Sequence, residues 1–435
     1  MAYTEAEARN LVILAARRLV DAGLTARTWG NLSARISDEQ FVITPSGLGY
    51  DIMEPEDLVV VNISDLSYEG NRKPSSEKGI HADAYRLRPE VNFVIHTHQD
   101  KASVYGIRGW DLSGLTASIL GKRVPCAAYG LPGTEKLRQA VADALSANPS
   151  SQAVLMKAHG ALCLGADCES AFQAAEELEK ACAGRVGEVL DEELSMYREQ
   201  RALWPMPDYG RSQRKGHFFK LKYGSVTRIY DLRNVPADGS SPAAIHAAIY
   251  RSTKARYIIH VRSASTVALS ILGKTVHPYL DDLAQIAGPD VRCARFFDDR
   301  RLPRAVSRAL LGRNAALLED CGGFCIGKTA DDVTAAASLL EKGCEAALYA
   351  KLLGDCEPLS PVDARLQRLV YQAGYSRKKG KKADAQTQPE TAAAEAEAET
   401  ETVSEAAAAT EATVEVATET AAEALREGEP ACSGG

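Results

Sequence analysis

The 435-residue sequence has no run of about 18 apolar residues, the length that a membrane-spanning helix needs. Its first residues lack the basic and then apolar layout of a secretory signal peptide. Its ten cysteines form no Cys-x-x-Cys pair, so they indicate reduced and mostly buried thiols. These absences argue against a membrane protein and predict a cytoplasmic location.

A strong overall charge is also missing once the C-terminal end is set aside. Residues 383–435 carry thirteen acidic side chains against Arg426 alone, and the run 377–382 carries five positive charges. The remaining body is close to neutral although the whole chain has a net charge of -7, so nothing favours a nucleic-acid partner. The basic run fits either a solvated linker or a contact with an acidic partner.

The C-terminal segment lacks aromatic residues and is rich in Ala, Glu and Thr from about residue 376. Such a composition cannot bury enough apolar surface to offset the chain entropy. We therefore predict a disordered tail over residues 376–435, with the chemistry elsewhere.

What is present is, first, an internal repeat. Four stretches return in the same order: Ser75–Arg86 as Ser240–Arg251, Phe93–His98 as Tyr257–Arg262, Val154–Gly165 as Ala316–Gly327, and Leu178–Cys182 as Leu340–Cys344. Order and spacing agree too well for chance, so the sequence predicts two copies of one domain, over residues 1–200 and 215–360. No counterpart of the first helix or of residues 30–47 is evident in the second copy.

Local patterns give the start of the first copy. Thr4 and Glu7 form a capping-box pattern for a helix that ends at Gly23. Apolar runs predict strands at 41–43 and 58–61, and a helix is expected around 78–87.

Three histidines stand where predicted strands end. His96 and His98 close an apolar strand that begins at Val91, and side chains two apart in a strand project to the same face. His159 follows the apolar run 153–156. Catalytic zinc commonly takes three protein ligands and keeps one position open. The set predicts a divalent-metal site; the alternatives are a His-x-His pair without metal and an ordinary loop histidine.

Glu77 opens the helix that carries His81. A carboxylate at a helix N-terminus is stabilised by the helix dipole. Beside a metal it can transfer a proton or act as an extra ligand. Taken alone it is a helix-start residue.

Three short polar loops, 30–33, 44–47 and 74–76, offer hydroxyls, an amide and backbone N–H groups. These groups suit a phosphate dianion. In isolation each loop is an ordinary turn, and the combination with Glu77 and the histidines gives them weight.

This ordered set resembles the class II aldolase/adducin family, which includes fuculose- and rhamnulose-phosphate aldolases and ribulose-phosphate epimerase. The resemblance covers residues 5 to about 190, and its motifs are Gly30-Asn31, Thr44–Gly47, Pro74–Glu77, His96-Thr97-His98, Ala128–Thr134 and His159-Gly160.

The resemblance implies an α/β fold: a three-layer α/β/α domain with a mainly antiparallel central sheet. It implies a divalent metal, usually zinc, on His96, His98 and His159, with Glu77 as the acid/base. It suggests that the substrate phosphate is held by Asn31, Ser46, Gly47, Ser75 and Ser76. Family members are often fourfold assemblies with sites at subunit interfaces, so a homo-oligomer is expected.

The implied function is a metal-dependent aldolase that cleaves a small phosphorylated ketose or related sugar, with zinc stabilising the enediolate. Alternatives are an epimerase or dehydratase on the same scaffold, or a non-catalytic adducin-like scaffold. Glu77, where the epimerases typically have Asp, favours the aldolase. The four intact site residues argue against the scaffold.

Two features depart from the family pattern. A catalytic tyrosine expected some 20 residues after His98 has no match near Leu115 and Thr116. The second copy, which the family pattern does not include, replaces Glu77, His98 and His159 by Pro242, Arg262 and Cys321.

That copy keeps His260 and is predicted to be catalytically dead. It either covers the first copy's site in place of a neighbouring subunit or is a structural spacer. We expect the Arg262 guanidinium to occupy the region where the metal sits in the first copy.

Overall fold

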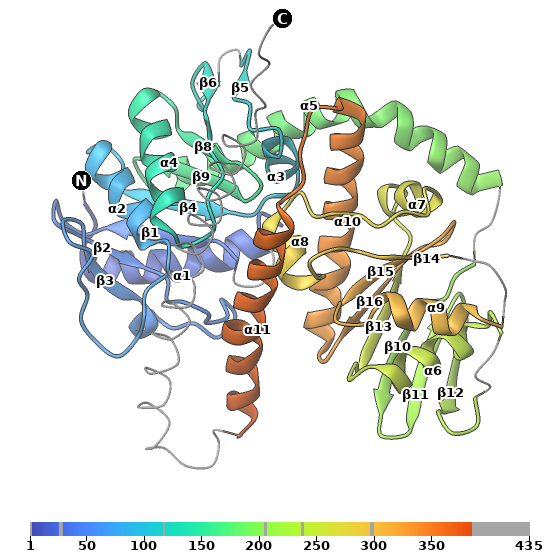
Figure 1. The fold of residues 1–435 in the computed structure, drawn as a ribbon. Helices are drawn as coiled ribbons and strands as arrows, with labels where there is room; N and C mark the ends of the chain where they lie inside the picture. Colours follow the sequence, from blue (N-terminus) through green and yellow to red (C-terminus); the bar gives the residue numbers. More distant parts are fainter. Residues whose placement is uncertain are drawn as a thin grey trace, which may run out of the picture. The chain divides into compact units, whose positions relative to one another are not determined.

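The computed structural model describes residues 2–25, 29–115, 118–203, 207–235, 239–295 and 300–384. The first copy contains α1 (Glu5–Asp21), β1 (Asn31–Arg35), β2 (Gln40–Ile43), the short 3-10 helix Pro55–Asp57, β3 (Val59–Asn62), α2 (Lys78–Leu87), β4 (Phe93–Thr97), α3 (Asp100–Gly106), β5 (Leu112–Ser113), β6 (Arg123–Val124), β7 (Cys126–Ala127), α4 (Glu135–Ala147), β8 (Ala153–Met156), β9 (Gly160–Gly165) and α5 (Cys168–Leu203) (Figure 1).

The predicted local signals form as expected. Thr4 caps α1, and the Glu7 side chain bonds back to the Thr4 backbone, so the capping box is confirmed. The expected strands correspond to β2 and β3, and the expected helix at 78–87 is α2.

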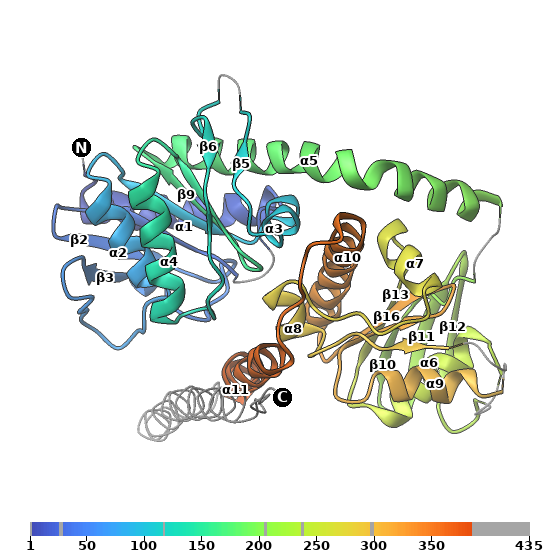
Figure 2. The same cartoon turned by 45° about the horizontal axis from the view of Figure 1, so that its top comes forward.

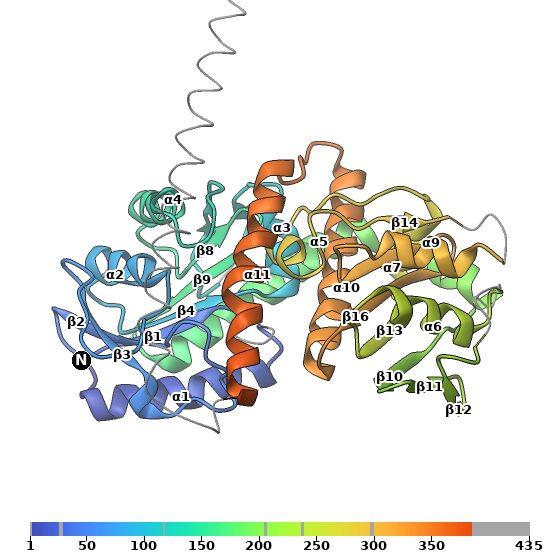
Figure 3. The same ribbon diagram turned by 60° about the horizontal axis from the view of Figure 1, so that its bottom comes forward.

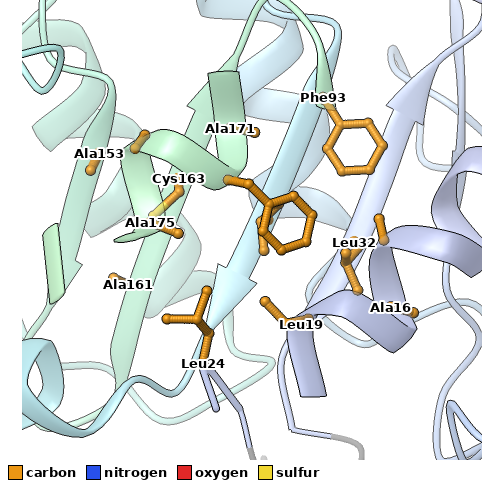
Figure 4. Close-up of a cluster of buried hydrophobic side chains, with 14 of the residues drawn as sticks. Ala16, Leu19, Leu24, Leu32, Phe93, Ala153, Ala161, Cys163, Ala171 and Ala175 are labelled. Atoms are coloured by element: carbon orange, nitrogen blue, oxygen red, sulfur yellow. The ribbon is translucent and has the colours of Figure 1, made fainter. Parts of the chain in front are cut away.

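One seven-stranded sheet, in the order β3-β2-β1-β4-β9-β8-β7, organises the first copy. All neighbouring strands are antiparallel except β7 and β8. Alternate residues of a strand face opposite sides of the sheet. Phe93 packs in the core formed with α1 and α5 (Figure 4), whereas Val94 packs in the core formed with α2 and α4. The predicted three-layer α/β/α domain with a mainly antiparallel sheet is confirmed.

This alternation positions the site. His96 lies two residues after Val94, so its side chain projects toward the face covered by α2. Glu77 is the residue immediately before α2. The packing of α2 on this sheet face therefore brings the carboxylate and the strand histidine together.

The second copy repeats the architecture. It contains β10 (Arg211–Lys215), β11 (Phe218–Tyr223), β12 (Val226–Asp231), α6 (Pro242–Ser252), β13 (Tyr257–Val261), α7 (Ala264–Ile271), α8 (Asp281–Ile286), β14 (Cys293–Ala294), α9 (Leu302–Ala309), β15 (Ala315–Leu318), β16 (Gly322–Gly327) and α10 (Ala330–Leu353). Its sheet has the order β12-β11-β10-β13-β16-β15-β14, which matches the first sheet strand for strand. Figure 2 shows this second sheet with α6 and α9 on one side.

One expectation about the second copy was wrong. Residues 211–231 form β10, β11 and β12, the counterparts of β1, β2 and β3, so the segment after residue 30 does have an equivalent. The match was missed because exposed lysines and arginines replace the apolar residues on one face of these strands. The expectation that the second copy lacks an equivalent of α1 agrees with the described residues, which contain no helix between α5 and β10.

The far end of α5 belongs to the second core. Val186, Leu190 and Leu194 cluster with Val261 and Leu269 of the second copy. A single continuous helix thus joins the two copies, and α10 packs against both α5 and α3.

The last element, α11 (Pro361–Asp384), lies beside α8 (Figure 2 and Figure 3). Its Arg368 side chain donates to the carbonyls of Gln285 and Ile286. The helix continues past residue 376, where the tail was expected to begin. Residues 385–435 of the predicted tail lie outside the described residues. No helix in the described part of the chain is long and apolar enough to cross a membrane, and all nine described cysteines are free.

Candidate metal centre

The three predicted histidines converge in the first copy. Each offers one ring nitrogen, and these atoms all lie within 4.8 Å of one another. His96 is the last residue but one of β4, His98 directly follows the strand, and His159 occupies the turn between β8 and β9. All three side chains are buried. The prediction that they form one cluster is confirmed geometrically.

The turn at His159 depends on its neighbours. Ala158 has a φ of 62°, and a Cβ on Gly160 would lie 2.1 Å from the Thr97 carbonyl oxygen. Only glycine allows β9 to approach β4 this closely. The His-Gly pair therefore brings His159 against the end of the strand that carries the other two histidines.

Hydrogen bonds fix the orientation of His96. Its Nδ1 lies 3.0 Å from the Ala161 carbonyl oxygen, which can only accept, so Nδ1 carries the proton. Nε2 then carries no proton and presents a lone pair, and it has no hydrogen bond among the described residues. It lies 3.4 Å from Oε2 of Glu77. A lone pair in this state is what a metal ion requires.

Burial sets the charge of the cluster. Desolvation lowers the pKa of His96 to about 3 and that of His98 to about 4, so both rings are neutral near pH 7. For His159 burial also opposes the charged form, but the carboxylates of Asp281 and Glu77 outweigh it and raise the pKa to about 10. A metal bound at Nε2 of His159 would take the place of that proton.

Glu77 is not used as a helix cap. It stands at the N-cap of α2 with no capping hydrogen bond, and its Oε1 lies 3.1 Å from Nε2 of His159. Burial opposes its charge, but His96, His159 and the amide of Asn31 hold its pKa well below the usual value. An ionised carboxylate therefore lies against two of the three ring nitrogens. The alternative role as a helix-start residue does not explain this position.

A chain of buried hydrogen bonds runs from Tyr85 through Ser33, His81 and Asn31 to Glu77. Asn31 donates from Nδ2 to Oε2 of Glu77 at 2.8 Å and accepts from Nε2 of His81 at 2.5 Å. Because Nε2 of His81 carries the proton, its Nδ1 must accept from Ser33 at 2.6 Å, and Ser33 accepts from Tyr85 at 2.7 Å. Every donor in this chain points toward the carboxylate, so it favours the ionised form of Glu77.

The predicted phosphate residues fall into two groups. Both the nitrogen and the oxygen of the Asn31 amide are hydrogen-bonded, to Glu77 and His81, and this buried residue starts strand β1 rather than lying in an open loop. Ser46 donates its N–H to the Lys73 carbonyl and Ser75 donates to the Thr44 carbonyl, so these two loops run side by side. Ser46 and Gly47 are half-buried and Ser76 is exposed. A phosphate-binding role for the five residues stays a prediction.

The residues present fit a divalent cation. Four buried polar atoms at the site have no hydrogen bond among the described residues: His96 Nε2, His98 Nδ1, Asp281 Oδ1 and Asp282 Oδ1. Three carboxylates at the site, Glu77, Asp281 and Asp282, are buried, and the buried ammonium of Lys342 pairs with Asp282. Even with His159 protonated, the cations of Lys342 and His159 leave one negative charge in excess, and buried charge requires compensation. Imidazole nitrogens with a carboxylate are a donor set that suits zinc and similar ions.

Sequence reasoning missed several of these residues. Asp281, Asp282 and Lys342 come from the second copy, and nothing local marks them as site residues. Ser33 and Tyr85 left a signal, because their counterparts Ser212 and Tyr250 stand at matching places in the repeat. Leu115, near the place expected for a tyrosine, packs against the first core, and Thr116 lies outside the described residues.

The second copy has no comparable site among its described residues. His260 accepts at Nδ1 from the Tyr209 N–H and donates from Nε2 to the Cys321 carbonyl, so both ring nitrogens are engaged. Arg262 lies 3.7 Å from Asp208. That its guanidinium occupies the region equivalent to the metal site of the first copy stays a prediction.

Comparisons with known proteins agree with this geometry. The family model for the class II aldolase and adducin N-terminal domain matches residues 10–186 and again 214–348. The chain therefore belongs to the class II aldolase/adducin family, and it carries the family's domain twice.

Each individual relative matches a stretch of this chain that is about as long as one copy of the domain. A 5-deoxy-D-ribulose 1-phosphate aldolase of Bacillus thuringiensis serovar kurstaki is 35% identical over 174 residues, which is 39% of this chain and 80% of the relative. The L-fuculose phosphate aldolase of Escherichia coli (strain K12) is 32% identical over 174 residues, or 38% and 79% of the two chains. A solved L-fuculose 1-phosphate aldolase structure is 29% identical with a TM-score of 0.40, covering 44% of this chain and 89% of its own.

Proposed function

We propose that the first copy holds one divalent metal, zinc by its donor set, on His96, His98 and His159, and cleaves a carbon–carbon bond of a small phosphorylated ketose. The observation that carries this proposal is the convergence of three buried ring nitrogens with an ionised Glu77. The relatives named above are aldolases of phosphorylated sugars, which supports the substrate class.

When bound, the metal supplies a Lewis acid that polarises the substrate carbonyl. The chain's own residues do the rest. Glu77 is held ionised by Asn31 and is placed to receive or return a proton at carbon. The loops that carry Ser46 and Ser76 hold the non-reacting phosphate end, so that their binding energy orients the reacting end.

The same centre serves an epimerase or dehydratase equally well in its metal and proton chemistry. Glu77 favours carbon–carbon cleavage by the family resemblance, and product analysis separates the three reactions. A homo-oligomer and a cytoplasmic location are part of the proposal by the same resemblance and by the sequence composition.

The test is metal content and turnover of the full chain purified without chelator. We expect about one zinc or other divalent ion per chain, lost in the double variant His96→Ala, His98→Ala. The matched control is His260→Ala, the counterpart of His96 in the second copy, which should keep the metal. Wild type that binds no metal after reconstitution would remove the lyase proposal and favour the scaffold. If the chain binds metal but cleaves no ketose phosphate, the proposed metal centre stands and the proposed reaction is wrong.

A further inference from the structure

One wall of the metal centre comes from the second copy. Asp281, the first residue of α8, is fully buried, and its Oδ2 lies 2.5 Å from Nδ1 of His159. The Asp281 N–H also donates to the Ala158 carbonyl at 3.0 Å. Two hydrogen bonds thus tie the start of α8 to the turn that carries His159.

The partner of each histidine shows what Asp281 does. His96 is oriented by a carbonyl of its own sheet, Ala161. His159 has no such local partner: its Nε2 faces Glu77, and its Nδ1 meets only the carboxylate of Asp281. A metal-binding imidazole normally donates its second N–H to a carboxylate or carbonyl, which fixes the tautomer and the ring orientation.

A second contact holds α8 in this place. Lys342 of α10 donates to Oδ2 of Asp282 at 2.9 Å and to the His98 carbonyl at 3.0 Å. The same ammonium therefore links the second copy to the strand end that carries two of the three histidines. Lys342 and Asp282 are almost fully buried, so this pair is shielded from solvent.

We propose that the second copy completes the first copy's metal site within one chain, with Asp281 as the positioning residue that fixes the tautomer and orientation of His159. This inference rests on the proposed metal centre. It gives the degenerate copy a role other than that of a spacer, because the copy that lost its own ligands supplies a carboxylate to the site that kept them.

The experiment compares wild type, Asp281→Asn and Asp290→Asn as full chains. Asp290 is the control, because it is a second-copy carboxylate that pairs with Arg313 and not with a histidine. Zinc affinity is measured by competition with a chromophoric chelator, and the cobalt(II) absorption spectrum reports ligand geometry. We expect Asp281→Asn to keep one metal per chain, bind it 10- to 100-fold more weakly and shift the cobalt spectrum. Asp290→Asn should match wild type in both.

The outcomes separate this inference from the proposed function. Equal zinc affinity and equal cobalt spectra in wild type and Asp281→Asn would overturn the positioning role while leaving the metal centre intact. Wild type without metal would overturn both. Wild type that binds metal but cleaves no sugar phosphate removes only the reaction. If Asp281→Asn does not fold, Asp281→Ser, which also removes the carboxylate, is measured instead, and wild-type affinity and spectrum in that variant would overturn the inference.

Discussion

Both copies carry the same buried tyrosine–serine–histidine chain, yet only in the first does it lead to a carboxylate. In the first copy, His81 donates to Asn31, which donates to Glu77. In the second, Gly210 stands at the place of Asn31, and Nε2 of His246 has no partner among the described residues. The shared part ties a sheet strand to the following helix in both copies, so it belongs to the fold. The proposed chemistry depends on the amide and carboxylate that the second copy lacks.

The same contrast holds for the strand-end histidines. His96 leaves one ring nitrogen free for a ligand, whereas both nitrogens of His260 are hydrogen-bonded to the backbone. The two copies thus share a core, but the strand-end histidine of the second copy has a structural role. The second copy contributes the start of α8 to the site of the first.

The largest expected effect comes from exchanging the carboxylate between copies. Glu77→Gln keeps the hydrogen bond to Asn31 but cannot accept a proton, so we expect turnover to fall by about 10²–10⁴ with metal still bound. The reciprocal change Pro242→Glu restores a carboxylate at the second copy's matching helix start. It should add no metal, because the nitrogens of His260 stay engaged.

Steady-state kinetics with the ketose phosphate that wild type cleaves, together with metal analysis, check both variants. Two metals per chain in Pro242→Glu would break the comparison, because the second copy would then be one residue away from a live site. Unchanged turnover in Glu77→Gln would remove the proton-transfer role.

A second test uses two lysines in identical local sequence. Leu-Glu-Lys occurs at 178–180 and again at 340–342, but Lys180 is exposed whereas Lys342 is buried against Asp282. Lys342→Met leaves the Asp282 carboxylate buried and unpaired, which should cost about 3–5 kcal/mol of unfolding free energy. Lys180→Met removes an exposed charge and should stay within about 0.5 kcal/mol of wild type.

Urea unfolding of the two variants measures this difference. The double variant Lys342→Met, Asp282→Asn should recover part of the loss, because no unpaired charge remains. Equal stability of the two single variants would show that the buried Lys342–Asp282 pair contributes nothing to stability.

These lysines also show where sequence reasoning ends. The three-layer fold, the repeat and the cluster of His96, His98 and His159 could be predicted, because strand periodicity and strand ends are local properties. The contacts of Lys342 and Asp281 could not, since the same tripeptide is exposed in one copy and buried in the other. Only the packing of one copy on the other decides that.

The strands of residues 211–231 are an intermediate case. Phe219 and Leu221 are buried and alternate with exposed Lys220 and Lys222, which is the period of two expected for a strand with one solvated face. The signal was present but was masked by the change from apolar to charged residues between copies. The equivalence is evident when the alternation of apolar and polar residues is compared instead of residue identity.

The smallest expected effect concerns acid stability. Burial lowers the pKa of His246 to about 3, far below the value of about 6.5 for an unfolded histidine. Between these values the unfolded chain binds a proton that the folded chain does not, so stability falls as the pH falls from about 6.5. Each pH unit in this window costs about 1.4 kcal/mol for such a group. His246→Asn removes this titration and can keep the Ser212 hydrogen bond.

We therefore expect His246→Asn to be less stable than wild type at pH 7, with the difference shrinking as the pH is lowered to about 4.5. Urea midpoints at several pH values measure it, and His217→Asn, at an exposed histidine of the same copy, should follow wild type throughout. His81→Asn should flatten the acid limb in the same way, because burial also lowers the pKa of His81 to about 3. Unlike His246→Asn, it should also slow turnover if Glu77 acts as proposed, because His81, and not His246, is joined through an asparagine to a carboxylate. A pH-independent difference for His246→Asn would show that the pKa of this histidine is the same in the folded and the unfolded chain.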